Sequence, residues 1–249
     1  MENHKQMIKM LNSGSGTGTN TTSGGSSTST LNSSLTNIDF SAIEELDPSL
    51  SDGYRIIYDR ECPVELRFQE TAESPQEVGT LEAIKVKMLV TGKDSSPESV
   101  KIELSSECDL FFHFTHVVDE VGFRIMQQQQ KLMIDFVEYP KVLIRMLNNC
   151  IKEPHSHLAV FVIQRSGHSR LDFIKNMEYK FVELLTCNFV RSSDALVKQH
   201  IAYRYNAVKS RLALMQARLS DVNALVKIKN PSLLLQINRD QEKAKLKSK

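Results

Sequence analysis

The chain has 249 residues, of which 41% are hydrophobic and 24% charged, and its formal net charge is +1. No apolar run reaches the roughly 18 residues that a membrane span needs, and the N-terminus lacks the pattern of a signal peptide, so we expect a cytoplasmic protein without a membrane partner. Four cysteines lie far apart with no C-x-x-C pair, which excludes the usual zinc and dithiol motifs.

The first segment, residues 1–50, is predicted to be a disordered tail. Between residues 13 and 37 it consists almost entirely of Ser, Thr, Gly and Asn. Such a tract buries too little apolar area to offset its ordering entropy of roughly 1–2 kcal/mol per residue.

The middle of the chain predicts an α+β head, a mostly antiparallel β-barrel or sandwich with a helical pair. Alternating apolar residues indicate the strands, for example Ile84, Val86, Met88 and Val90. The predicted strands are two short ones in 54–68 with Pro63 at a bend or edge, then 81–92, 100–104, 110–118, 131–136, 157–164, 170–175 and 181–190. The predicted helices are 119–128 and 140–152.

The segment 131–150 changes its hydrophobic period from two to helical spacing at Pro140. This change predicts a short strand that leads directly into an amphipathic helix. Asp135 is an acid inside the apolar run, and we expect it to cap that helix rather than to act as a catalytic acid.

The chain continues into a long helix that we expect Asp194 to cap. Its apolar residues follow the 3-4 spacing of a coiled coil, with Pro231 ending the pattern. The alternative is an amphipathic helix packed on its own head. In this register Arg204 would face Lys209 of a partner, a repulsive contact that predicts weak pairing. The seam consists of Ile201, Tyr205, Val208, Leu212, Met215, Leu219, Val222 and Val226.

Charge is segregated along the chain. Residues 195–249 carry twelve Lys or Arg against three acidic residues, so the rest of the chain is acidic. The resulting boundaries are a tail at 1–50, a head at 51–194, a helix with a short seam at 195–228 and a basic tail at 229–249. A basic tail can bind nucleic acid, an acidic protein surface or its own head.

Several of these residues occur in a pattern that resembles the head domain of the centriolar cartwheel proteins, the spindle-assembly-abnormal-six family. The resemblance covers about Tyr54 to Leu219. It rests on Asp109-Leu110-Phe111-Phe112, on Phe123, and on the run Leu132, Asp135, Phe136, Tyr139, Pro140 and Leu143, with Phe189, Asp194, Val197, Lys198 and Gln199 downstream. Asp135, Phe136, Tyr139 and Pro140 are then structural core residues of the family.

The resemblance also implies a head-to-head interface at Tyr179 and Met177. Just before the last strand this family usually carries Asn-x-Phe, whose ring enters a hydrophobic pocket of a second head. Here Tyr replaces Phe and Met177 replaces Asn. A tyrosine ring is an equally good anchor if its hydroxyl finds a partner. The alternative is that Tyr179 folds back onto its own core.

No catalytic or metal-binding set is predicted, so we expect neither an enzyme nor a cofactor or metal. His113 and His116 are three apart in a predicted strand and therefore point to opposite faces. His155 and His157 beside Glu153, and His168 near Asp172, are expected to be solvated residues of loops and turns.

The expected function is structural self-assembly through head-to-head contacts and a helical seam, with other centriolar or flagellar cytoskeletal proteins as further partners. The resemblance implies the cytoskeleton of the cytoplasm: centriole, basal body, flagellar base or apical complex. The short seam suggests a short, cartwheel-like relative that lacks the long coiled coil. The alternative is a head-plus-coil scaffold of the DNA-repair type, although nucleic acid is not the expected partner.

Overall fold

A computed structural model describes residues 40–70, 79–93, 95–165 and 167–229, together with Ser232 and Arg239. Residues 40–214 form one compact unit, and the part of the last helix from Met215 onward belongs to a second unit. Residues 1–39 of the predicted N-terminal tail lie outside the described residues, and so does the predicted basic tail 229–249 apart from Lys229, Ser232 and Arg239.

The described residues form seven strands and several helical segments. Along the chain, two short helical segments are followed by four strands, two helices, three strands and a long helix. The elements are α3 (Ser41–Glu44), η1 (Pro48–Gly53), β1 (Arg55–Gln69), β2 (Thr80–Lys93), β3 (Ser96–Ser106), β4 (His113–Asp119), α4 (Glu120–Gln130), α5 (Tyr139–Lys152), β5 (His157–Gln164), β6 (His168–Asn176), β7 (Phe181–Arg191) and α6 (Asp194–Lys229).

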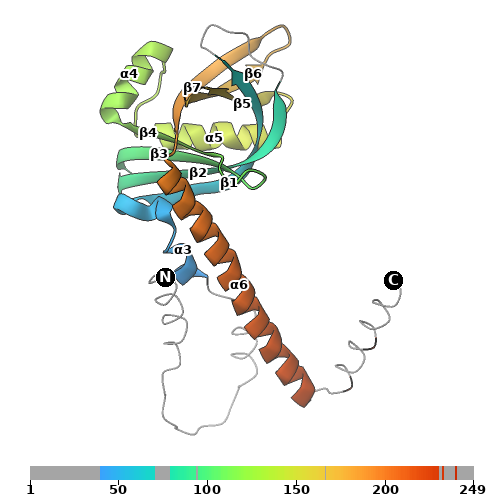
Figure 1. Ribbon diagram of the computed structural model, residues 1–249. Helices are drawn as coiled ribbons and strands as arrows, with labels where there is room; N and C mark the ends of the chain where they lie inside the picture. The colour runs from blue at the N-terminus through green and yellow to red at the C-terminus, as the bar shows by residue number, and fades with distance from the viewer. Residues whose placement is uncertain are drawn as a thin grey trace. The chain divides into compact units, whose positions relative to one another are not determined.

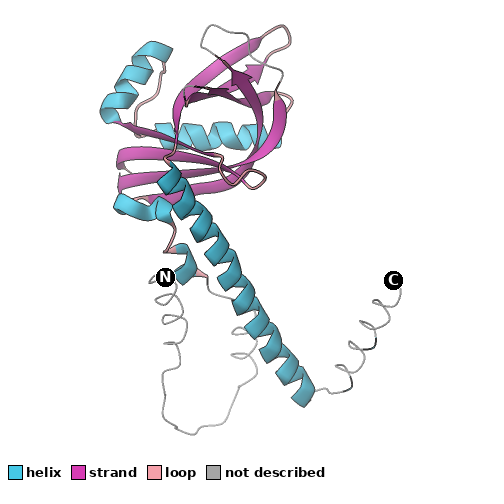
Figure 2. Ribbon diagram, in the orientation of Figure 1, coloured by secondary structure: helices cyan, strands magenta, loops and turns pink. Residues whose placement is uncertain are grey.

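The strands close into a barrel in the order β1-β2-β3-β4-β7-β6-β5 (Figures 1 and 2). All neighbours are antiparallel except β1 and β5, which run parallel. The predicted inward residues of β2, Ile84, Val86, Met88 and Val90, are all buried in the core. The predicted α+β class with a mostly antiparallel barrel and a helical pair is therefore confirmed.

The stretch around Pro63 is one continuous strand, so the prediction of two short strands was wrong. β1 stays paired with β2 across this point, with Pro63 opposite Ala83. β5 joins the other side of β1 only from Glu65 onward. Pro63 thus lies where β1 has a single neighbouring strand, which is the edge position that the sequence allowed as an alternative to a bend and where proline is tolerated.

The predicted strand at 131–136 is also wrong, because this segment is a loop between α4 and α5. Lys131 ends α4 in the left-handed conformation, and the N–H of Leu132 donates to the carbonyl of Gln127. The alternation is nevertheless real: Met133 is 96% exposed, whereas Phe136 packs in the core. The side chain of Gln127, which donates to the carbonyl of Ile134 at 2.7 Å, replaces a strand partner. Alternating burial requires only that one face of the segment packs on the core, whereas a β-strand also requires a neighbouring strand that forms hydrogen bonds with it.

The junction between β4 and β7 is the least regular part of the barrel. Only two residue pairs join these strands, Phe114 with Arg191 and Thr115 with Val190. Side chains continue the contact. Gln130 accepts from the N–H of Thr186 and donates to its carbonyl, and His116 bonds the carbonyl of Asn188 at 2.7 Å. The backbone groups of Thr186 and Asn188 on this side of β7 thereby find hydrogen-bond partners where β4 supplies none.

His116 is held neutral by its surroundings, because burial lowers its pKa. Its Nδ1 donates to the Asn188 carbonyl, so Nε2 accepts from the hydroxyl of Tyr139 at 3.2 Å. The unfolded chain binds a proton near the ordinary histidine pKa of about 6.5. The stability that His116 contributes is therefore present above that pH and is lost as the pH falls below it.

We predict that His116→Gln, which bonds similarly but does not titrate, reduces this acid sensitivity. Between pH 7.5 and 5.5 the parent should lose about 1 kcal/mol more unfolding free energy than the variant. Urea unfolding at both pH values measures the difference. Equal losses in the two proteins would show that other groups control the acid response.

The residues just before β1 form an ordered N-terminal arm, defined here as residues 40–53, which corrects the predicted tail of residues 1–50. Ile43 and Ser49 are buried in the head. The hydroxyl of Ser49 donates to Glu103 at 2.6 Å, and Lys87 pairs with Asp47. Burial alone would raise the pKa of Asp47, but the bonds with Lys87 lower it below its ordinary value. The arm was missed because its few apolar residues have no periodicity.

A pair of truncations tests the arm. A chain that begins at residue 54 should melt roughly 6–12 °C below one that begins at residue 40, since it exposes the site of Ile43 and leaves the buried Glu103 carboxylate without Ser49. Calorimetry of both proteins and of the full chain measures the shifts. The full chain is the control, and it should melt close to the chain that begins at residue 40. Equal melting of the two truncated chains would contradict the ordered arm.

The long helix α6 begins one residue beyond its cap. The hydroxyl of Ser193 accepts from the N–H of Leu196, so Ser193 is the capping residue and Asp194, predicted as the cap, is the first helical residue. Among the described residues, no helix has the length and apolar character required to cross a membrane.

Candidate self-association surfaces

The turn between β6 and β7 is a tight hairpin tip. It is closed by the N–H of Met177, which donates to the carbonyl of Lys180 at 2.9 Å. The base is fixed to the α5–β5 loop, because the backbone N–H of Asn176 donates to Ser156 and its side-chain amide donates to His155. The strands on either side are paired up to Asn176 and Phe181. The tip is therefore positioned by backbone hydrogen bonds and by the Asn176 side-chain amide.

The hairpin tip exposes apolar side chains. Tyr179 is 94% exposed, so it does not fold back onto its own core. Met177 and Phe181 are exposed beside it. Sequence reasoning singled out Tyr179 and Met177 but missed Phe181, which it had placed as the first residue of the last strand. Three large apolar residues exposed together, two on the turn and one at the start of β7, are typical of a contact surface rather than of a solvated loop.

A small hollow lies between α5 and the strands β5, β6 and β7. Its volume is about 130 Å³, similar to the roughly 150 Å³ of a cavity that binds benzene. The sequence contains no signal for this hollow, because its wall combines four separate elements. The lining residues are Arg145, Met146, Asn149, Cys150, His157, Leu158, Phe173, Ile174 and Leu184.

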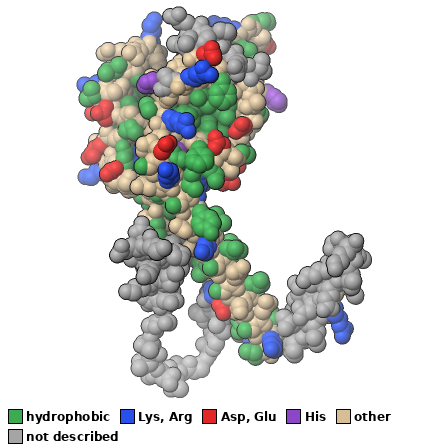
Figure 3. Space-filling model, in the orientation of Figure 1, with side chains coloured by type: hydrophobic (Ala, Val, Ile, Leu, Met, Phe, Trp, Pro, Cys, Tyr) green, Lys and Arg blue, Asp and Glu red, His purple; other side chains and the backbone are tan. Residues whose placement is uncertain are grey.

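The helix α6 uses different faces for the head and for the predicted seam. Val197, His200 and Ala207 are buried, whereas the seam residues Tyr205, Val208 and Leu212 are more than half exposed. In the second unit, Met215, Leu219 and Val222 are exposed as well. Figure 3 shows hydrophobic side chains recurring along the face of α6 in view. Packing of the first turns on the head thus leaves most of the seam exposed, with Ile201 and Val226 partly buried, so the two alternatives raised by the sequence are compatible.

Arg204, which was expected to repel a partner helix, is bound within the chain, and so is Arg211 one heptad later. Arg204 donates to the carbonyls of Ser106 at 3.1 Å and Leu110 at 3.3 Å. Arg211 pairs with Glu44 of the N-terminal arm at 3.4 Å, and its guanidinium lies over the ring of Phe40. The expected repulsion between Arg204 and a partner's Lys209 is therefore weaker than the heptad pattern suggests.

The four residues of the predicted family core lie at the start of α5. Phe136, Tyr139 and Pro140 are buried, and the rings of Phe136 and Tyr139 both pack on Phe123. Asp135 differs from its prediction. α5 has no side-chain cap, and it is the backbone carbonyl of Asp135 that accepts from the N–H of Tyr139 at 3.2 Å.

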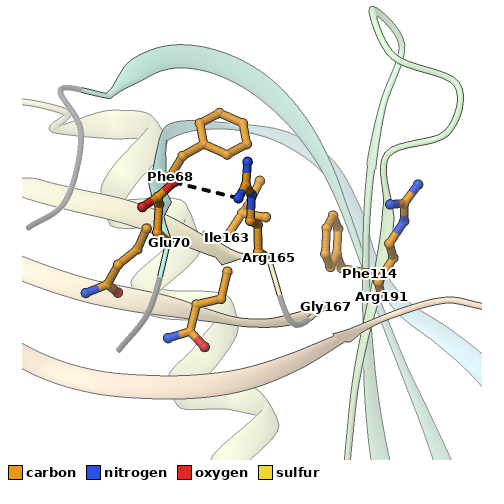
Figure 4. A pocket seen from close by; sticks show the side chains of 9 residues that line it. Phe68, Glu70, Phe114, Ile163, Arg165, Gly167 and Arg191 are labelled. Carbon is orange, nitrogen blue, oxygen red and sulfur yellow. Dashed lines mark ion pairs between the residues drawn. The ribbon is translucent and has the colours of Figure 1, made fainter. Parts of the chain in front are cut away.

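Another hollow, of about 480 Å³, opens among the ends of several strands (Figure 4). Phe68 and the ion pair of Arg165 with Glu70 lie on one side of it, and Phe114 and Arg191 lie on the other. Its described lining residues include no nucleophile beside a base and suggest no reaction.

The two strand histidines have different partners, as their predicted separation requires: His113 bonds Ser192, while His116 bonds Asn188 and Tyr139.

A family model described as the centriolar protein SAS N-terminal domain matches residues 56–189, more than half of the chain. The chain belongs to this family. The match runs through every strand of the barrel and includes the hairpin tip with Tyr179. The resemblance inferred from the Asp135–Tyr139 region is thereby confirmed.

Curated SAS-6 homologues are also similar to this chain. The spindle assembly abnormal protein 6 homolog of Danio rerio is 26% identical over 136 residues, which are 50% of this chain and 22% of that protein. The homolog of Gallus gallus is 24% identical over 172 residues, 66% of this chain and 26% of that protein. The chain thus spans about a quarter of the length of these relatives.

Solved SAS-6 structures share the fold. An N-terminal fragment of Leishmania SAS-6 that contains part of its coiled coil domain has a TM-score of 0.59 at 18% identity, covering 75% of this chain and 98% of that one. The N-terminal coiled-coil dimer of C. elegans SAS-6 has a TM-score of 0.50 at 14% identity, covering 69% of this chain and 98% of that one.

Proposed function

We propose that this protein is a structural self-assembly component of the centriole or of a related structure at the flagellar base. Its role is to oligomerise rather than to catalyse a reaction. Membership of the centriolar SAS family supports this proposal, and the observation that carries it is the fully exposed ring of Tyr179 on a backbone-fixed hairpin. An aromatic ring that is positioned but unburied is a ready anchor for a partner.

The head-to-head contact places Tyr179 of each head in the hollow beside α5 of the other. Ring and hollow occur once per head, so two heads satisfy each other around a twofold axis. Leu184, Ile174 and Leu158 supply apolar walls, and Arg145 and Asn149 offer polar partners for the tyrosine hydroxyl. A single anchor of this kind supports association that is micromolar or weaker.

The second contact runs along α6. The exposed residues Tyr205, Val208 and Leu212 continue the predicted heptads within the head unit. The C. elegans relative described as an N-terminal coiled-coil dimer supports pairing through this helix. Two different twofold contacts on one chain produce an open or ring-shaped assembly rather than a closed dimer, and each contact raises the effective concentration for the other.

Imaging of a fluorescently tagged copy in a flagellated cell tests the function. The tag should colocalise with centriole or basal-body markers. A copy with Tyr179→Glu should localise more weakly, because assembly depends on the head contact. Uniform cytoplasmic fluorescence of the unmodified copy would refute the centriolar role, whatever its self-association in solution.

A further inference from the structure

Three potential metal ligands meet at the base of α6. Glu103 lies on β3, His113 begins β4, and His200 lies in the second turn of α6. One ligand atom from each lies within 4.8 Å of the others, and all three side chains are buried. About ninety residues separate His200 from the other two, so only the fold brings the set together.

His200 has an unexplained polar atom. The side chain is only 6% exposed, and its Nε2 has no hydrogen-bond partner. A buried polar atom without a partner is rare in folded proteins and often marks the place of a bound ion or water. The ligand atoms of Glu103 and His113 lie within 4.8 Å of a His200 ring nitrogen, so a single ion could be bound by all three side chains.

His113 is already oriented for coordination. Its Nδ1 bonds the hydroxyl of Ser192 at 2.8 Å, which leaves Nε2 available. A metal-binding histidine usually bonds its second nitrogen in this way, because that bond fixes the ring and its tautomer. The rings of His113 and His200 lie 4.3 Å apart, centre to centre.

The charges around the set also permit a cation. Glu103 bonds Ser49 through one carboxylate oxygen and Lys101 through the other, at 3.1 Å. Lys101 has other partners, because its ammonium donates to the Ser49 carbonyl and lies 4.3 Å from the ring of Tyr54. It can therefore release the Glu103 oxygen to an ion. Lys87 is neutralised by Asp47.

The set is accessible from solvent through a hollow of about 450 Å³ between the N-terminal arm, the barrel and α6. Two imidazoles and a carboxylate form a donor set that suits zinc, with water as the fourth ligand. Ligand atoms around tetrahedral zinc lie roughly 3.3 Å apart, so pairs of these ligand atoms would approach by at most about 1.5 Å on binding.

We propose that Glu103, His113 and His200 bind a zinc-class divalent cation that ties α6 to β3 and β4. Both histidines sit on elements that no backbone ladder joins, so the ion would add a direct link between the barrel and the root of the helix. The site would thereby stiffen the direction in which α6 leaves the head. This inference does not depend on the proposed head-to-head contact.

Thermal unfolding of the untagged, chelator-treated full chain tests the site. Zinc at about 100 times its dissociation constant should raise the melting temperature by roughly 5–10 °C with a stoichiometry of one. Magnesium, which prefers all-oxygen sites, should have no such effect. No rise with zinc would overturn the proposal.

Variants distinguish this site from surface histidines. His200→Gln should abolish the zinc-dependent rise, and Glu103→Gln, which preserves the volume and can still accept from Ser49, should weaken zinc binding at least tenfold. His155→Gln, at an exposed loop residue, is the matched control and should behave as the parent. Circular dichroism confirms that each variant folds. An undiminished rise in both His200→Gln and Glu103→Gln, or its loss in His155→Gln, would refute the assignment.

Discussion

Tyr179→Glu is expected to abolish head-to-head association while leaving the fold intact. The ring is 94% exposed in the single chain, so its replacement removes no core contact. In the proposed dimer the same position is desolvated, and an unpaired carboxylate there is unfavourable. Loss of an interface anchor costs 2 kcal/mol or more, which weakens the dimer at least ~30-fold.

Analytical ultracentrifugation measures this effect in a Met215→Asp background, in which only the head contact remains. Tyr179→Phe should associate as well as the parent or slightly better, because the ring is kept. Met133→Glu is the matched control, since Met133 is an equally exposed apolar residue on a different loop. Association of Tyr179→Glu at the parent's level would show that Tyr179 is not the anchor.

The second large effect is expected in the helix. Met215→Asp places a charge at a seam position, where two copies of α6 would bury it, whereas Gln216→Asp lies next to it outside the seam. Both residues are exposed in the single chain, so neither change should affect the folded head. In a Tyr179→Glu background, only Met215→Asp should reduce the remaining dimer at high protein concentration.

Sedimentation equilibrium of the two seam variants decides between pairing and a solitary helix. A tenfold or larger increase in the dissociation constant is expected for Met215→Asp, since a charge at a buried seam position is desolvated without a partner. If both variants sediment as the parent does, α6 is monomeric or pairs through another face. If α6 is monomeric, negative-stain images of the unmodified chain should show no higher assemblies, whereas pairing through another face would preserve them.

The two proposed contacts together would allow each interface to be weak. In the proposed assembly, binding through Tyr179 would hold two heads near each other, and pairing along α6 would then be effectively intramolecular. The in-chain bonds of Arg204 and Arg211 contribute to this arrangement, because they direct positive charge toward the head and the arm instead of a partner helix. Substitution of Arg204 or Arg211 is therefore expected to affect the geometry of the assembly more than the stability of the fold.

The sequence by itself determined the features that depend on local pattern. The alternation of Ile84, Val86, Met88 and Val90 identified β2, since one face of a strand must be apolar to be buried. The 3-4 spacing of α6 identified a seam residue set distinct from its buried face. The position of Tyr179 in a turn between two strands was also correct, because turn and strand propensities are properties of neighbouring residues.

Only the tertiary structure decided the features that need a distant partner. The 131–136 segment alternates like a strand but has no neighbour to pair with, and Pro63 stays within a strand because β5 joins only beyond it. The N-terminal arm is ordered because Ser49 and Asp47 find Glu103 and Lys87 far along the chain. The Glu103, His113 and His200 set likewise exists only where β3, β4 and α6 converge. Such hydrogen bonds and ligand sets join residues that are far apart in the sequence, so no local sequence pattern predicts that they lie close together.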